Sequence, residues 1–183
     1  MRADVPSLRS KKVLRELRNS WRRACERGEF RIVHYSLQRN HAHLIVEAQG
    51  RQALSRGMKS AAARLARAVN RAHGRRGPVL DGRFHHRVLR TPREVRNGLA
   101  YVLLNIRKQW AERYRGARRP LRLEEASSGR WFDGWRGPPA GGDPPNLGED
   151  PEVAPPRSWL LRVGWRRHGR IDPTEVPGFA GAR

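Results

Sequence analysis

Cysteine, lysine and long apolar runs are scarce in this 183-residue chain, and each scarcity excludes a class of protein. The single cysteine, Cys25, excludes a disulfide framework and a cysteine-rich zinc site. No apolar run approaches the ~20 residues that a membrane-spanning helix needs, so no membrane partner is expected. The first residues lead into a basic helical pattern with no apolar segment, which is atypical of a secretory signal.

Acidic residues are also few, and the charge is unevenly distributed along the chain. There are 39 Lys+Arg against 17 Asp+Glu, a formal net charge of +22, and only four of the basic residues are lysine. Residues 1–120 hold 30 basic and 8 acidic residues, whereas residues 121–183 hold 9 of each. Because a planar guanidinium binds two phosphate oxygens at once, the first two thirds are typical of a protein that binds a polyanion.

Hydrophobic periodicity predicts three amphipathic helices, over residues 7–27, 51–73 and 92–115. Two strands, Phe30–Leu37 and His41–Ala48, are predicted to form a hairpin, and a third strand is predicted within 79–89, best at 84–89. Thr91, followed by Pro92 and Glu94, predicts a capping box at the start of the last helix. This order predicts an α+β fold, and it matches the ferredoxin-like β-α-β-β-α-β order except that the first strand is missing.

The predicted organisation is a nucleic-acid-binding body over residues 1–116, followed by three shorter parts. Residues 117–137 form an aromatic extension, residues 138–156 a Pro/Gly-rich linker and residues 157–183 a short C-terminal segment. The four tryptophans after residue 120 are expected to pack onto the body rather than to stack on nucleic-acid bases.

Two pairs of side chains have the spacing that metal-assisted chemistry requires. His41 and His43 lie on one face of their strand, so both imidazoles can ligate one divalent ion, although two such histidines are also common as ordinary polar strand residues. Tyr101 and Asn105 lie one helical turn apart, where the amide oxygen is a candidate third ligand and the phenol a candidate nucleophile. A tyrosine at this position is also typical of the edge of a core.

The order of these motifs resembles one family closely. The motifs are Asn40-His41-Ala42-His43-Leu44-Ile45-Val46-Glu47, then Gly82-Arg83-Phe84-His85, then Tyr101-Val102-Leu103-Leu104-Asn105. The chain resembles the single-tyrosine HUH transposases and, within them, the bacterial REP-associated tyrosine transposases. The resemblance covers roughly Phe30 to Trp110 and implies a ferredoxin-like sandwich that is followed by a C-terminal catalytic helix.

The resemblance also implies an activity and its site residues. His41, His43 and Asn105 would hold Mg²⁺ or Mn²⁺, although two imidazoles would also admit zinc or cobalt. Tyr101 would attack single-stranded or hairpin DNA, form a 5′-phosphotyrosine and release a 3′-hydroxyl. The chain would act as a monomer or homodimer at the bacterial nucleoid. DNA contacts are expected from the basic surface: Arg56, Lys59, Arg64, Arg67, Arg75, Arg76, Arg83, Arg87 and Lys108.

Three explanations of the missing first strand stay open: a start codon assigned too late, a decayed transposase, or a rearranged sheet. The first is favoured, because residues 1–8 resemble the end of a strand that leads into a helix. The alternative function is a domesticated or decayed protein that binds DNA or RNA hairpins without cleaving them. A basic ribosome- or RNA-associated protein would explain the charge but not the His, Tyr and Asn residues.

Overall fold

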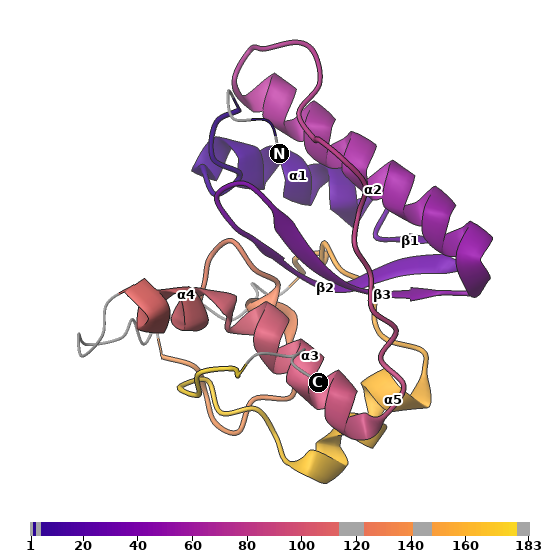
Figure 1. The fold of residues 1–183 in the computed structure, drawn as a ribbon, viewed down its shortest axis with the longest axis vertical. Coiled ribbons are helices and arrows are strands. Elements are labelled where there is room, and N and C mark those ends of the chain that lie inside the picture. Colours follow the sequence, from indigo (N-terminus) through magenta and orange to yellow (C-terminus); the bar gives the residue numbers. More distant parts are fainter. Residues whose placement is uncertain (1, 3–4, 114–122, 141–147, 179–183) are drawn as a thin grey trace.

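The computed structural model describes residues 2, 5–113, 123–140 and 148–178. The described chain is a mixed α+β structure in which an antiparallel sheet, ordered β1-β2-β3, lies between two layers of helices (Figure 1). Helices α1 and α2 cover one face, and α3 with the C-terminal segment covers the other. The elements are α1 (Lys11–Arg22), β1 (Glu26–Arg27), β2 (Phe30–Leu37), β3 (Ala42–Ala48), α2 (Gly50–Ala72), α3 (Pro92–Leu103), α4 (Asn105–Arg113), a 3₁₀ turn η1 (Gly129–Trp131), α5 (Trp159–Arg162) and a second 3₁₀ turn η2 (Gly164–His168).

The hairpin of β2 and β3 is the centre of the fold, and the sequence predicted it correctly. Its register runs from Phe30 opposite Ala48 to Leu37 opposite Ala42, with an irregularity between Ile32 and His34. All eight residues of β2 are buried, because the strand is covered on both faces. In β3 the even-numbered side chains face the α1–α2 layer, and Ile45 lies in the core beneath α3, as alternation requires.

Helices α1 and α2 form the first hydrophobic core with the sheet. Leu17 and Trp21 of α1 are each 1% exposed, and the Trp21 ring meets the Tyr35 ring edge-on at 4.9 Å. The α1 helix is shorter than the 7–27 predicted, because the Ser10 side chain accepts a hydrogen bond from the Val13 amide and so starts it later. The α2 helix agrees closely with the predicted 51–73.

The predicted helix 92–115 is wrong as a single element, because it breaks at Leu104 into α3 and α4. The start is as expected: Thr91 accepts from the Glu94 amide, and the Glu94 side chain accepts from the Thr91 amide. Four consecutive residues from Val102 to Asn105 are buried, which one straight amphipathic helix cannot achieve. The break therefore allows two faces of this segment to enter the core. Residues 114 and 115 of that prediction lie outside the described residues.

The strand predicted within 79–89 is also wrong. Residues 80–88 are exposed throughout and form neither helix nor strand, so Phe84 and Val88 point to no apolar partner. Within the part of the chain that is described, β3 pairs only with β2, and no strand lies beyond it. Residues such as Phe84 favour strands only where a neighbouring strand supplies backbone partners. The described residues thus contain the α-β-β-α centre of the ferredoxin-like order without its first and last strands.

The C-terminal part of the chain completes the core. It also pairs with the stretch of the β2 edge that the short strand β1 leaves uncovered. The Leu37 amide donates to the Ala126 carbonyl at 2.8 Å, the Ser128 amide to the Tyr35 carbonyl at 3.0 Å, and the Ala154 amide to the Ile32 carbonyl at 2.8 Å. A second core beneath α3 contains four side chains from this part: Phe132, Trp135, Trp165 and Ile171. Trp131 is half-buried beside the first core, so three of the four tryptophans pack onto the body, as expected.

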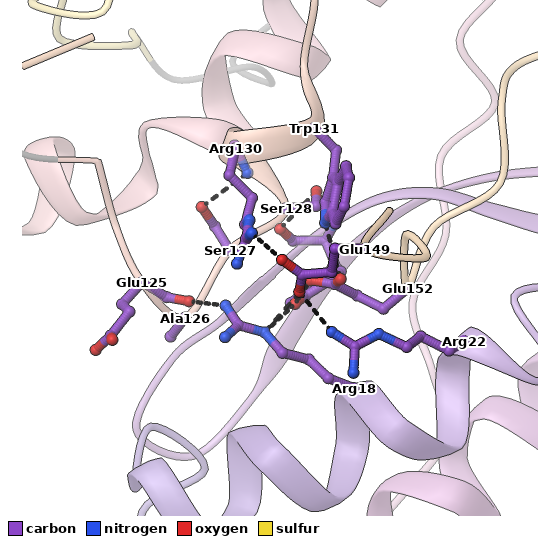
Figure 2. A network of polar contacts seen from close by, with 12 residues as sticks. Arg18, Arg22, Glu125, Ala126, Ser127, Ser128, Arg130, Trp131, Glu149 and Glu152 are labelled. Carbon is purple, nitrogen blue, oxygen red and sulfur yellow. Dashed lines mark hydrogen bonds and ion pairs between the residues drawn. The ribbon is translucent and has the colours of Figure 1, made fainter. Parts of the chain in front are cut away.

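A buried carboxylate fixes the segment around residues 149–154 to α1 and β2 (Figure 2). Glu152 is fully buried and accepts hydrogen bonds from Tyr35 Oη at 2.7 Å and Trp131 Nε1 at 2.8 Å, while Arg18 Nε lies 3.3 Å away. Glu149 pairs with both Arg22 and Arg130. Burial, followed by the nearby Glu152 charge, raises the pKa of Tyr35 far above its ordinary value. Tyr35 therefore acts as a neutral hydrogen-bond donor.

Candidate active site

Two imidazoles converge at the start of β3. His41 Nε2 and His43 Nε2 lie 3.1 Å apart, and the two rings meet edge-on with centroids 4.8 Å apart. His41 is exposed and His43 half-buried, so the pair lies at the surface of the sheet face that carries α3. Asn40 Oδ1 lies 2.9 Å from His41 Nδ1, and an Nδ1–H that donates there leaves the Nε2 lone pair directed at His43.

The geometry of this pair fits two ligands of a single metal ion. Two metal–nitrogen bonds of ~2.1 Å at a right angle bring their nitrogens about 3 Å apart, which is close to the separation in the structure. Burial first, and then the neighbouring His41 and Lys108, lowers the pKa of His43 to about 4, and burial lowers the pKa of His41. Both rings are therefore neutral near pH 7, which is the form that binds a metal.

Tyr101 of α3 lies beside the histidine pair. Its ring centroid is 5.1 Å from that of His43, with the rings nearly perpendicular, and Lys108 Nζ lies 5.0 Å from the Tyr101 ring centroid. Leu99, Val102 and Leu103 anchor α3 in the core and so fix the position of the half-buried tyrosine. The fold thereby assembles side chains from β3, α3 and α4 that are about sixty residues apart in the sequence.

Asn105 lies near this cluster in the chain but is engaged elsewhere. It begins α4, is 2% exposed, and its Oδ1 accepts a hydrogen bond from Gln109 Nε2 at 3.0 Å. Among the described residues, no group of three or more His, Cys, Asp or Glu side chains could hold a metal ion. Among those described residues, a third protein ligand at the histidine pair would be an amide or another neutral oxygen, and Asn105 stays the predicted one.

The residues predicted to bind DNA lie on three separate surfaces. Those of α2 lie across the sheet from the histidine pair, since α2 and α3 cover opposite faces (Figure 1). There Arg64 donates to Ser20 Oγ, and it borders a groove of about 410 Å³ between α1 and α2. By surface, the set divides into Arg56, Lys59, Arg64 and Arg67 on α2, Arg75, Arg76, Arg83 and Arg87 in the 73–91 connection, and Lys108 beside Tyr101.

Sequence reasoning missed the role of Glu47. Its side chain lies on the histidine face of β3 and accepts hydrogen bonds from the backbone amides of Arg157 at 2.8 Å and Ser158 at 2.7 Å. It therefore fixes the start of α5 to the far end of the strand that carries His43. Its place on the histidine face was the available signal, but nothing in the sequence indicated its partner more than a hundred residues later.

Fold and site together define an α+β domain that presents two imidazoles and a tyrosine on one sheet face, within a strongly basic chain. Residues 5–89, just under half of the chain, match the family described as Transposase IS200 like. The matched part contains α1, the hairpin with both histidines and α2, and it is similar to that family. Members of this family are transposases and act on DNA.

Comparisons with the curated proteins and with the solved structures found no match to this chain. No helix in the described residues is both long and apolar enough to cross a membrane.

Proposed function

We propose that this chain cleaves and rejoins single-stranded or hairpin DNA through a covalent 5′-phosphotyrosine at Tyr101. The observation that carries the proposal is the 5.1 Å approach of the Tyr101 and His43 rings, which combines a nucleophile with a metal-binding pair on one face. The family match supports DNA as the substrate. The finer assignments, to the REP-associated branch and to a ferredoxin-like sandwich, rest on the order of motifs from Asn40 to Asn105.

The chemistry balances without an added energy source. Tyr101 Oη attacks phosphorus, the bond from phosphorus to the 3′ oxygen breaks, and that oxygen leaves as a 3′-hydroxyl after it takes up a proton. Attack by another 3′-hydroxyl reverses these steps, rejoins the DNA and frees the tyrosine. A phenol of ordinary pKa near 10 is a poor nucleophile at neutral pH and needs activation.

The residues around Tyr101 have separable tasks in this proposal. His41, His43 and Asn105 would hold Mg²⁺ or Mn²⁺, which when bound neutralises phosphate charge and polarises phosphorus. Lys108 places a cation beside the Tyr101 ring, where it attracts the scissile phosphate. Leu99 and Val102, which bury the inner face of α3, keep the phenol at the histidine pair.

The proposal is tested by trapping the covalent adduct. Labelled hairpin DNA from the flanks of the chain's own gene is incubated with the protein and Mn²⁺, and the products are separated under denaturing conditions. We expect a slowly migrating protein–DNA adduct that disappears with Tyr101→Phe, with His43→Ala and with chelator. His73→Gln, which changes an exposed histidine at the end of α2, is the matched control and should leave the adduct intact.

The second candidate is a protein that binds hairpins without cleaving them. Two observations favour it: the sheet in the described part of the chain lacks the strand expected at 84–89, and the basic face of α2 lies away from the histidine pair. Tight hairpin binding with no adduct under any metal condition would establish this alternative and overturn the strand-transfer proposal.

A further inference from the structure

One tryptophan of the C-terminal part does not pack into the core. Trp159, the first residue of α5, is 49% exposed, whereas Trp165 only six positions later is 1% exposed. An indole is a large, flat apolar surface with a polar N–H edge, so a half-exposed ring is available to contact a partner. Val163, one turn further along, is 52% exposed, so the exposed strip continues past α5.

The Trp159 ring is nevertheless held in a defined place. A Cβ on Gly164 would lie 2.6 Å from ring atom Cζ3, so the ring rests directly against the glycine backbone and a larger residue there would displace it. The Arg167 guanidinium carbon lies 4.8 Å from the Trp159 ring centroid, in a cation–π arrangement. Trp159, Gly164 and Arg167 are together called the Trp159 platform.

The surroundings of the Trp159 platform are strongly basic. The stretch from 157 to 170 contains five arginines and one histidine and no acidic residue. Arg162, Arg167, His168 and Arg170 are all exposed. A flat aromatic ring among exposed arginines complements a ligand that has flat apolar faces and a regular negative charge. Single-stranded nucleic acid has both, since its bases stack on aromatic rings while its phosphates pair with arginine.

The Trp159 platform is rigidly attached to the face that carries Tyr101. Glu47, on β3, accepts hydrogen bonds from the Arg157 and Ser158 amides immediately before Trp159. It lies four residue steps along the strand from His43, about 13 Å. On the other side, Arg96 of α3 pairs with Glu175 at 2.8 Å and donates to the Gly169 carbonyl. The Trp159 platform and the histidine pair are thus at two ends of the same face, at a separation that a few nucleotides can span.

We propose that the Trp159 platform is a base-stacking site for single-stranded DNA, which holds the strand a few nucleotides away from the histidine pair. The choice of DNA rests on the proposed function. The stacking itself rests on the exposed ring, its seat on Gly164 and the surrounding arginines. The site lies in the C-terminal part, outside residues 5–89, so the family match does not account for it.

The test is equilibrium binding of a short labelled oligothymidylate in chelator, so that no cleavage is needed. Fluorescence anisotropy gives the affinity, and quenching of tryptophan emission reports stacking. We expect Trp159→Ala to weaken binding about tenfold and Trp159→Phe to restore part of the affinity. Arg167→Ala should reduce the slope of log affinity against log salt by about 0.7. Val163→Ala, which removes exposed apolar area from the same strip without a ring, is the matched control.

An abasic oligonucleotide of the same length separates stacking from charge. The parent protein should prefer the oligothymidylate over the abasic strand, and Trp159→Ala should lose that preference while its circular dichroism and melting temperature stay those of the parent. Unchanged affinity in Trp159→Ala, or an equal loss in Val163→Ala, would overturn the proposal and point to a protein partner on this strip. The binding assay does not depend on Tyr101. A failure of the adduct experiment therefore does not decide whether the Trp159 platform stacks bases.

Discussion

Histidines in this chain show how burial alone changes the chemistry of a residue type. His34 of β2 is 7% exposed, its Nδ1 lies 3.2 Å from Ser128 Oγ, and its ring meets Phe132 edge-on at 5.3 Å. Burial lowers its pKa to about 4, with a smaller opposing effect of Asp133. His41 and His43, at the turn end of the same hairpin, are instead accessible to a ligand. Packing therefore assigns His34 a structural role and leaves the other two for chemistry.

The buried His34 makes stability depend on pH. In the unfolded chain the pKa of His34 is near 6.5. Between about pH 6.5 and 4 the unfolded state therefore binds a proton at His34, and the folded state does not. The free energy of unfolding should therefore fall as the pH falls through this window, by up to ~3 kcal/mol from this residue, and level off below it. Urea denaturation at a series of pH values measures the effect.

His34→Gln is the variant that isolates this contribution. It should be less stable than the parent near pH 7, because the packing is altered, but its stability should fall less steeply between pH 6.5 and 4. His73→Gln, at an exposed position, should keep the parental pH dependence. If the His34→Gln and parental curves run parallel, proton exclusion at His34 is not a source of the pH dependence.

Secondary-structure elements could be predicted where the segments that pair are close together in the sequence. They could not be predicted where the partner lies far along the chain. The β2–β3 hairpin has both strands and its turn within nineteen residues, so alternation was sufficient to predict it and to place His41 and His43 on one face. The strand expected at 84–89 has strand-forming residues but no neighbour in the described sheet. The break at Leu104 also depends on distant partners, because Leu103 and Leu104 share a buried cluster with Trp135 and Trp165 of the C-terminal part.

The candidate site shows the same limit. Alternation and helical spacing predict the faces of His43 and Tyr101, but their 5.1 Å approach depends on how α3 crosses the sheet. The resemblance to a family predicted that His43 and Tyr101 form one site, and the packing of α3 on the sheet brings them together. The resemblance predicted no role for Glu47 or Trp159, because their roles depend on contacts with the C-terminal part.

The start of α3 is an element whose stability the sequence does predict. Thr91 and Glu94 cap it reciprocally, with the Glu94 amide 3.2 Å from Thr91 Oγ1. Thr91→Ala should lower the free energy of unfolding by ~1 kcal/mol, because the first-turn amide loses its side-chain acceptor. Thermal or urea denaturation measures this loss. Thr91→Ser, which keeps the hydroxyl, should restore most of it, and a Ser variant as unstable as Ala would show that the methyl group rather than the cap matters.

At the scale of the whole molecule, the equal numbers of acidic and basic residues in the last third of the chain have a structural role. Three of its carboxylates pair with arginines on or just before α1: Glu124 with Arg9, Glu149 with Arg22 and Glu152 with Arg18. The C-terminal part thereby holds α1 (Figure 2) and completes the edge of β2. The arginines around Trp159 stay exposed. Charge is thus neutralised where the chain closes on itself and retained where DNA is proposed to bind.

Glu152 should dominate this closure, because it alone of the three is fully buried. Glu152→Gln leaves Arg18 without its counter-charge and disturbs the hydrogen bonds from Tyr35 and Trp131, so we expect a loss of ~3 kcal/mol in the free energy of unfolding. Glu16→Gln, which removes the exposed ion pair with Arg71, should cost less than ~1 kcal/mol.

Salt and protease distinguish these two pairs further. An exposed pair is screened by high salt, so the small effect of Glu16→Gln should vanish there, whereas the Glu152→Gln loss should persist because water and ions do not reach the buried carboxylate. Limited proteolysis should cut the Glu152→Gln protein first around residues 149–156, since that segment loses its buried anchor. Equal losses from the two variants, or a Glu152→Gln effect that salt abolishes, would mean that apolar packing by Trp135 and Trp165, and not this carboxylate, holds the C-terminal part in place.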